Sequence, residues 1–301
     1  MKKKILLTGG SSSVGKNLME SHMAEKYEVF APRSRELDLT DSAAVREYFG
    51  KHKFDAVIHS AIRPGHRNAG SLEGFTEANM SMFNNLAACR SSYGIFLNIG
   101  SGAVYDVSRD NRRVKETDLL PPEGDNLTTR YKFALHNAIE KLDNFYDFNI
   151  FGFFGKYEDW EIRFISNAIC KTLYGLPITL RQDRIFSYLW AEDLSQVLEH
   201  FIDGNAPFRH KAYNVTPDEE ISLKQAAEIV ADIAEEKTGM RPEIKIARPG
   251  MGLSYSGDNS RLKEEMPGIK FTSYKTSISK LYAWYEQNKE KIDRNLLLKD
   301  K

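Results

Sequence analysis

The sequence predicts a doubly wound α/β fold, in which helices cover both faces of a parallel sheet. Short apolar runs alternate with amphipathic segments through the first half of the chain, and the segments between the runs are long enough for helices. Strands joined in this way pair in parallel through right-handed crossovers. A glycine-rich turn also links the first apolar run to the first helix, in the stretch LLTGGSSSVGKNL at residues 6–18.

The individual elements follow from the periodicity of the apolar residues. In the first half, strands are expected over residues 5–7, 27–31, 56–58 and 95–99, and helices over residues 14–25, 41–52 and 76–93. In the second half, the apolar spacing predicts helices over residues 160–174 and 222–237. Breaks rich in glycine and proline at 175–177, 204–207 and 249–257 indicate a smaller, loop-rich region of mixed α/β structure.

Composition and charge argue against several kinds of partner. The 301 residues are 41% hydrophobic and 28% charged, and the net charge is zero, so neither nucleic acid nor an anionic membrane is expected to bind. Cys89 and Cys170 have no C-x-x-C spacing, so we expect no disulfide, no metal site and a reducing, cytoplasmic location. No apolar run approaches the ~18 residues of a membrane span. The N-terminal run is also too short for a signal peptide, so none is expected.

The glycine-rich turn is typical of a site that binds a phosphate group. A strand, a turn without bulky side chains and a helix N-terminus leave backbone N–H groups pointing at the ligand, and the helix dipole favours its charge. Residues 8–15 fit the pattern T-G-x-x-G-x-x-G, except that Ser12 replaces the middle glycine, which normally lets the backbone approach a pyrophosphate. The alternative is a surface turn with no ligand. The residues expected to form the phosphate loop are Gly9, Ser12, Ser13, Val14 and Gly15.

The end of the second predicted strand indicates which dinucleotide binds. A fold of this type that prefers NAD usually places Asp or Glu there, on the ribose hydroxyls. This chain has Arg33, Ser34 and Arg35 instead, and guanidinium groups can grip an additional 2′-phosphate bidentately. The sequence therefore favours NADP(H) over NAD(H), unless the two arginines are simply solvated on a loop.

The chain resembles the extended short-chain dehydrogenase/reductases, the NAD-dependent epimerase/dehydratase family, in six segments that follow in the family's order. The segments are the turn at 8–15, residues 37–41, 57–61 and 100–105, Tyr131 at the start of a helix, and residues 149–152. Residues 186–194 and 213–215 match the downstream pattern, so the resemblance covers almost the whole chain. The chain looks most like the nucleotide-sugar epimerases and 4-keto-reductases, such as GDP-fucose synthase and dTDP-4-dehydrorhamnose reductase.

The resemblance implies a Rossmann fold and a division of the chain. Residues 1–155, with 186–204 returning to them, are expected to form the NADP(H)-binding domain, and residues 156–185 and 205–290 the substrate-binding region. Residues 291–301 are rich in Lys and Asp and are expected to fray. Relatives often pair through a four-helix contact, so a homodimer is expected. Further cofactor contacts implied by the resemblance are Asp38, Leu39, Ser60, Ala61 and Tyr131.

The resemblance also implies catalytic residues. In the family, a tyrosine exchanges a proton with a sugar oxygen while nicotinamide exchanges a hydride with the attached carbon, and a serine or threonine orients that oxygen. By motif position these residues are Tyr131 and Ser101. The family's lysine, four residues after the tyrosine, lowers the tyrosine pKa, but Leu135 stands in that place. Lys132 is rotated ~100° around the helix from Tyr131, so its ammonium is expected to point elsewhere.

Leu135 leaves three interpretations open. The chain is a weakened enzyme, a binding protein that kept its pocket after losing its chemistry, or an altered form of an active parent. Tyr131 can also be interpreted as a packed tyrosine at a helix start, and Ser101 as a turn serine after a strand.

The resemblance favours a nucleotide-diphosphate sugar as the ligand. Residues 101–103 lack both the acid of the family's dehydratases and the cysteine of GDP-fucose synthase, which leaves 4-keto reduction or 4-epimerisation. An NADP(H) site favours reduction, and the alternative is a catalytically silent NADP(H) or sugar-nucleotide binding protein. Substrate contacts are expected from Ser101, Asn149 and Arg184, although Asn149 could cap a turn and Phe186 stands where the family has its arginine.

Overall fold

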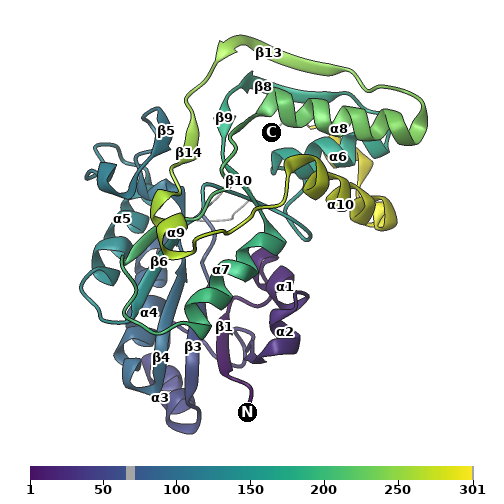
Figure 1. Cartoon of the computed structure of the whole chain (residues 1–301). Helices are drawn as coiled ribbons and strands as arrows, with labels where there is room; N and C mark the ends of the chain where they lie inside the picture. The colour runs from purple at the N-terminus through teal and green to yellow at the C-terminus, as the bar shows by residue number, and fades with distance from the viewer. Residues whose placement is uncertain (66–71, 300–301) are drawn as a thin grey trace.

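A six-stranded parallel sheet forms the centre of the N-terminal part of the molecule (Figure 1). The computed structural model of the chain describes residues 1–65 and 72–299. The strands lie in the order β2-β1-β3-β4-β6-β11, and every neighbouring pair is parallel. This arrangement confirms the predicted doubly wound fold. The strands are β1 (Lys4–Thr8), β2 (Glu28–Phe30), β3 (Phe54–His59), β4 (Tyr93–Ile99), β6 (Phe145–Asn149) and β11 (Ala212–Asn214).

The central strands carry continuous apolar runs because both of their faces are covered. Ile5 and Leu7 of β1 belong to a hydrophobic cluster shared with helices α1, α2 and α7. Leu6, which lies between them and points to the other face, belongs to a second cluster shared with α3, α4 and α5. The helices are α1 (Ser13–Met19), α2 (Met23–Lys26), α3 (Ser42–Lys51), α4 (Phe75–Ala88), α5 (Leu127–Ile139) and α7 (Ala191–Asp203).

Two expected helices are shorter than their apolar periodicity suggests. The segment predicted as one helix over 14–25 breaks after Met19, and the Ser21 hydroxyl donates to the backbone oxygen of Leu18 at 2.7 Å, where the first piece ends. The segment predicted over 76–93 leaves the helix at Ala88, turns through η1 (Arg90–Ser92) and enters β4 at Tyr93. Strand pairing therefore decides the second boundary.

The C-terminal region combines short strands with three helices that share one hydrophobic cluster, α6 (Phe164–Leu173), α8 (Leu223–Thr238) and α10 (Tyr274–Gln287). Two-stranded parallel ribbons join β7 (Gly152–Phe154) to β10 (Tyr188–Trp190) and β8 (Ile178–Asp183) to β13 (Ile244–Met251). A four-stranded sheet contains β12 (Ile221–Ser222), β9 (Ile185–Phe186), β14 (Tyr255–Gly257) and β5 (Asn111–Val114). Other short elements are η2 (Gly102–Val104), η3 (Glu116–Asp118) and α9 (Ser260–Glu265).

Two segments lie differently from the expected division of the chain. Strand β5 belongs by sequence to the expected NADP(H)-binding domain, yet it pairs with β14 of the C-terminal region. The segment 291–301, which is expected to fray, follows η4 (Lys289–Lys291) and contains α11 (Arg294–Leu297). Its Ile292 and Leu297 bury their side chains in the C-terminal cluster. Residues 300–301 lie outside the described residues.

The sheet has a topological switch point at β1. Strand β2 pairs with one edge of β1 and β3 pairs with the other. In open α/β sheets, ligands bind outside the carboxyl ends of the strands at such a point, because the connections leave in opposite directions and open a crevice. The turn after β1 and the residues after β3 therefore mark where a site is expected.

Candidate active site

The turn after β1 is built around two glycines that leave no room for a side chain. Gly9 has a positive φ of 72°, and a Cβ added to it would lie 2.7 Å from the backbone nitrogen of Ala61. A Cβ on Gly15 would lie 2.3 Å from the backbone oxygen of Gly9, so α1 packs directly against the turn. These positions match the glycine roles of a dinucleotide-binding turn.

Ser12, the residue in place of the middle glycine, caps α1. Its hydroxyl accepts a hydrogen bond from the backbone N–H of Gly15 at 3.0 Å, and its φ of −70° needs no glycine. Among residues 1–65 and 72–299, no hydrogen-bond acceptor faces the backbone N–H of Ser13 or of Val14. The cap therefore uses the serine side chain locally and leaves two N–H groups free at the helix N-terminus.

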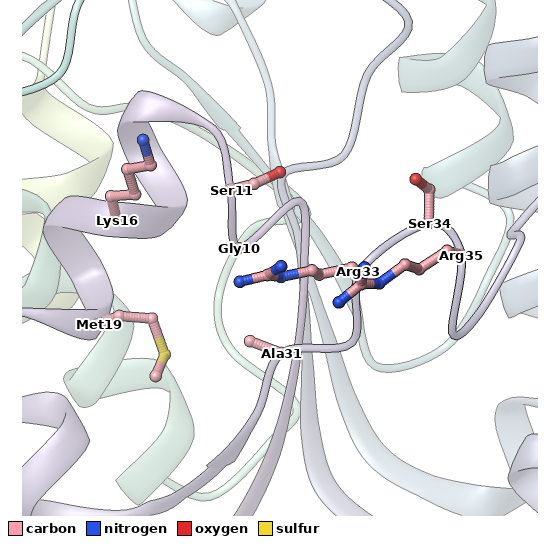
Figure 2. Close-up of a pocket in the computed structure, with 8 residues that line it drawn as sticks. All are labelled: Gly10, Ser11, Lys16, Met19, Ala31, Arg33, Ser34 and Arg35. Carbon is pink, nitrogen blue, oxygen red and sulfur yellow. The ribbon is translucent and has the colours of Figure 1, made fainter.

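A cavity of about 730 Å³ lies beside this turn, between α1 and the loop after β2 (Figure 2). Its charged lining residues are all cations, Lys16, Arg33 and Arg35. The backbone N–H of Arg33 donates to the Glu36 carboxylate at 2.8 Å, which fixes the loop that carries both arginines. The full lining is Gly10, Ser11, Lys16, Met19, Ala31, Arg33, Ser34 and Arg35.

Sequence reasoning found the two arginines and Ser34 but missed Lys16 and Met19. The available signal was helical spacing, since Ser12, Lys16 and Met19 follow at intervals of four and three residues and share one face of α1. Asp38 and Leu39 do not line the cavity. The Asp38 carboxylate accepts hydrogen bonds from Thr40. Leu39 is buried in the hydrophobic cluster that the sheet shares with helices α3, α4 and α5.

Side-chain hydrogen bonds connect the carboxyl ends of β1 and β3 at the switch point. The Thr8 hydroxyl and His59 Nδ1 lie 2.8 Å apart, and the Ser60 hydroxyl donates to the backbone oxygen of Thr8 at 2.8 Å. Burial, aided by the charge of Lys132, lowers the pKa of His59 to about 3, so its imidazole is neutral. Ala61 completes the contact, because its N–H faces the Thr8 hydroxyl at 3.3 Å. Ser60 and Ala61 thus lie directly beside Gly9 of the phosphate loop.

Ser101 lies at the carboxyl end of β4, where it begins η2. Its hydroxyl accepts a hydrogen bond from the Ala103 N–H at 3.1 Å and lies 3.5 Å from the hydroxyl of Tyr255. Tyr255 belongs to β14, 154 residues further along the chain. No motif identifies it in the sequence, and only the fold brings it to the site.

Tyr131 and Leu135 both face the hydrophobic cluster between α5, α4 and the sheet. The ring of Tyr131 lies edge-on to that of Phe75, with 5.5 Å between centroids, and burial raises the pKa of its hydroxyl. Among the described residues, no hydrogen bond joins Tyr131 to Ser101. The placement differs from that expected of a tyrosine that shares a substrate oxygen with Ser101.

The ammonium of Lys132 lies over the ring of its neighbour Tyr131, with Nζ 5.2 Å from the centroid, so it does not point away from the tyrosine as the helical rotation predicts. The Lys132 side chain is 9% exposed and makes no hydrogen bond or ion pair within the described part of the chain. Burial lowers the pKa of Lys132, against the opposing charge of Asp147. Asp147 itself accepts hydrogen bonds from Asn98 at 2.7 Å and from His136 at 3.3 Å.

The expected substrate contacts come from three different elements of the fold. Arg184 lies over the ring of Phe186, with its guanidinium carbon 4.9 Å from the centroid, and Phe186 in turn contacts Tyr255. Arg184 and Phe186 are therefore connected to Ser101 through Tyr255. The Arg184 Nε is buried without a partner in the described structure. Asn149 lies at the end of β6, where its amide N–H donates to the Asn214 side-chain oxygen at 3.4 Å. The residue after it, Ile150, accepts a hydrogen bond from the N–H of Gly102, the residue after Ser101, at 2.9 Å.

Within residues 1–65 and 72–299, no group of three or more His, Cys, Asp or Glu side chains is placed to hold a metal ion. Over the same residues, no helix combines the length and apolar character needed to cross a membrane.

Known proteins resemble this chain in sequence and in fold. The chain is 26% identical over 253 residues to GDP-L-colitose synthase of Yersinia pseudotuberculosis, covering 76% of this chain and 82% of that one. It is 31% identical over 153 residues to GDP-L-fucose synthase of Azorhizobium caulinodans, covering 48% and 49% of the two chains. A GDP-mannoheptose C4 reductase from Campylobacter jejuni, solved with NADP bound, matches the fold with a TM-score of 0.77 at 19% identity, over 95% of this chain and 98% of that one.

A sequence profile gives the assignment to a family. The profile of the NAD dependent epimerase/dehydratase family matches residues 5–216, which is more than half of the chain. The matched segment includes the glycine turn, the sheet, Ser101 and α5. This chain therefore belongs to the NAD dependent epimerase/dehydratase family.

Proposed function

We propose that this chain uses NADPH to reduce the 4-keto group of a nucleotide-linked sugar. The observation that carries the proposal is the cavity beside the phosphate loop, whose charged side chains are Lys16, Arg33 and Arg35. Three cations without a carboxylate suit a phosphorylated ribose, and they do not suit the ribose hydroxyls of NAD. The substrate class is supported by the relatives, which are a GDP-L-colitose synthase, a GDP-L-fucose synthase and a GDP-mannoheptose reductase.

The residues present fit a dinucleotide. The free N–H groups of Ser13 and Val14 would hold its diphosphate, and Gly9 and Gly15 keep the turn clear of side chains. When bound, reduced nicotinamide supplies a hydride. Ser101, at the carboxyl end of β4, would orient the sugar oxygen, and Arg184 would meet the substrate's phosphates from the C-terminal region.

We further propose that Lys132 supplies the positive charge for which Leu135 is unsuited. A buried ammonium without a hydrogen bond is costly, and a ribose hydroxyl would satisfy it. On helix α5, Tyr131 and Leu135 share the face that packs toward α4. Lys132 lies on another face of the same helix, which it shares with Thr128, four residues earlier. With a lysine available, the main reason for a catalytically silent protein is removed, and we favour an enzyme.

A labelled turnover experiment tests the function. The purified chain is mixed with NADPH carrying deuterium at the transferred position and with GDP- or dTDP-linked 4-keto sugars, and NADPH absorbance and product NMR are recorded. We expect loss of NADPH and deuterium at sugar C4. NADPH binding without turnover of any 4-keto sugar would favour the silent binding protein, and isomerisation without net NADPH loss would favour a 4-epimerase. The matched control uses NADH.

A further inference from the structure

Among the described side chains, Tyr255 provides the hydroxyl that lies within hydrogen-bond distance of Ser101. The two oxygens are 3.5 Å apart. Tyr131 lies in the hydrophobic cluster between α5, α4 and the sheet, and no hydrogen bond joins it to Ser101 among the described residues. A substrate oxygen oriented by Ser101 would therefore meet the phenol of Tyr255, which comes from β14 in the C-terminal region.

The ring of Tyr255 is held in place from several sides. Its centroid lies 5.2 Å from that of Phe151 and 5.9 Å from that of Phe186. Its backbone oxygen accepts a hydrogen bond from the N–H of Ser187 at 3.2 Å. A Cβ on Gly257, two residues later, would lie 2.3 Å from the ring of Phe151, so this strand packs closely against its neighbours. The hydroxyl consequently has a fixed position, as a proton donor requires.

The charges around Tyr255 suit a group that starts protonated. Burial raises the pKa of its hydroxyl to about 12, although the hydrogen bond to Ser101 and the charges of Arg163 and Arg184 oppose this. The phenol is therefore neutral near pH 7 and can give a proton away. The same two guanidinium groups would stabilise the phenolate that forms when it does so.

We propose that Tyr255, oriented through Ser101, is the acid that protonates the sugar oxygen during reduction. The inference rests on the proposed function, because the sugar carbonyl must be the reacting group. The carbonyl carbon gains a hydride from reduced nicotinamide, and the π electron pair moves onto oxygen. That oxygen takes the proton of the Tyr255 hydroxyl, leaving a phenolate, and a proton from solvent restores the phenol. The product is an alcohol, and atoms and charge balance.

Three tyrosine-to-phenylalanine substitutions, each of which removes one hydroxyl group, test this role. Tyr255→Phe is expected to lower kcat by about 10²–10⁴-fold, the usual contribution of a general acid, with little change in KM or NADPH affinity. Tyr48→Phe on α3 is the matched control. Among the described residues the Tyr48 hydroxyl makes no hydrogen bond, and the ring packs against the hydrophobic cluster between the sheet and helices α3, α4 and α5. Tyr131→Phe is the competing arm. Loss of activity in Tyr131→Phe with retention in Tyr255→Phe would overturn the proposal.

A rescue variant guards against a folding defect in the first one. Tyr255→His restores a proton donor with an ordinary pKa near ~6.5, so we expect partial recovery of kcat that fades as the pH rises through that value. Equal activity of Tyr255→Phe and the parent chain would refute the inference and leave the proposed function intact. Absence of turnover by the parent chain would remove both. NADPH binding and thermal unfolding of every variant are measured alongside.

Discussion

Replacing Leu135 with lysine tests the placement of helix α5. The resemblance assigns the family's lysine to position 135, so a lysine there would be expected to restore chemistry. The structure places the Leu135 side chain, 1% exposed, in the cluster between α5, α4 and the sheet. We therefore expect Leu135→Lys to damage the fold and to add no activity.

The expected size of the effect follows from burial. Removing a fully buried leucine costs about 2 kcal/mol in apolar burial. Forcing an unpaired ammonium into the same place costs several kcal/mol more, even after relaxation. Together the loss is on the order of 5 kcal/mol, which is comparable to the whole stability of a marginal domain. The variant should unfold at much lower urea concentration, or fail to accumulate as a folded protein.

Urea unfolding of Leu135→Lys is compared with that of Ala134→Lys, which adds the same charge to an exposed position of the same helix. The control is expected to differ from the parent chain by less than about 0.5 kcal/mol. The reasoning is refuted if Leu135→Lys is as stable as the control and gains NADPH-dependent turnover, because Leu135 would then face the cofactor.

Three further predictions concern the charged residues. Replacing both Arg33 and Arg35 with alanine should weaken NADPH binding by about 10²-fold, since charge-assisted hydrogen bonds to the 2′-phosphate are lost, and should leave NADH binding unchanged in calorimetry. Lys132→Met should lower turnover by at least about tenfold without lowering the melting temperature, because it removes a buried charge. Burial raises the pKa of Glu158 from 4.5 to about 7 despite its 2.7 Å hydrogen bond from Ser166. Glu158 therefore loses its proton at a lower pH in the unfolded chain than in the folded chain. The free energy of unfolding should fall by roughly 3 kcal/mol as the pH rises from 4.5 to 7. Glu158→Gln should abolish this slope in urea unfolding; an unchanged slope would contradict the assignment.

The parts of the site that depend on local sequence could be predicted. The turn from Gly9 to Gly15 is a contiguous segment whose geometry follows from residues without side chains, and the structure keeps it as expected. Arg33 and Arg35 also lie on the loop directly after a strand whose end was predictable, and both line the cavity.

The parts of the site that depend on which face a helix buries could not be predicted from the sequence. The motif spacing drew attention to Tyr131 and Leu135, but the orientation of α5 is set by contacts such as that between Tyr131 and Phe75 of α4, far away in sequence. The partner of Ser101 was equally hidden, because Tyr255 arrives on a three-residue strand that pairs with β5 and β9. Neither contact leaves a periodic signal in the chain.

The central claim is that the turn and the arginine loop together bind a phosphorylated dinucleotide, and isothermal titration of the unaltered chain with NADPH and with NADH tests it most directly. We predict saturable heat with one NADPH per chain and an affinity at least about tenfold weaker for NADH, since an ionic contact to the 2′-phosphate is missing. No heat with either cofactor, or tighter binding of NADH, would contradict the account.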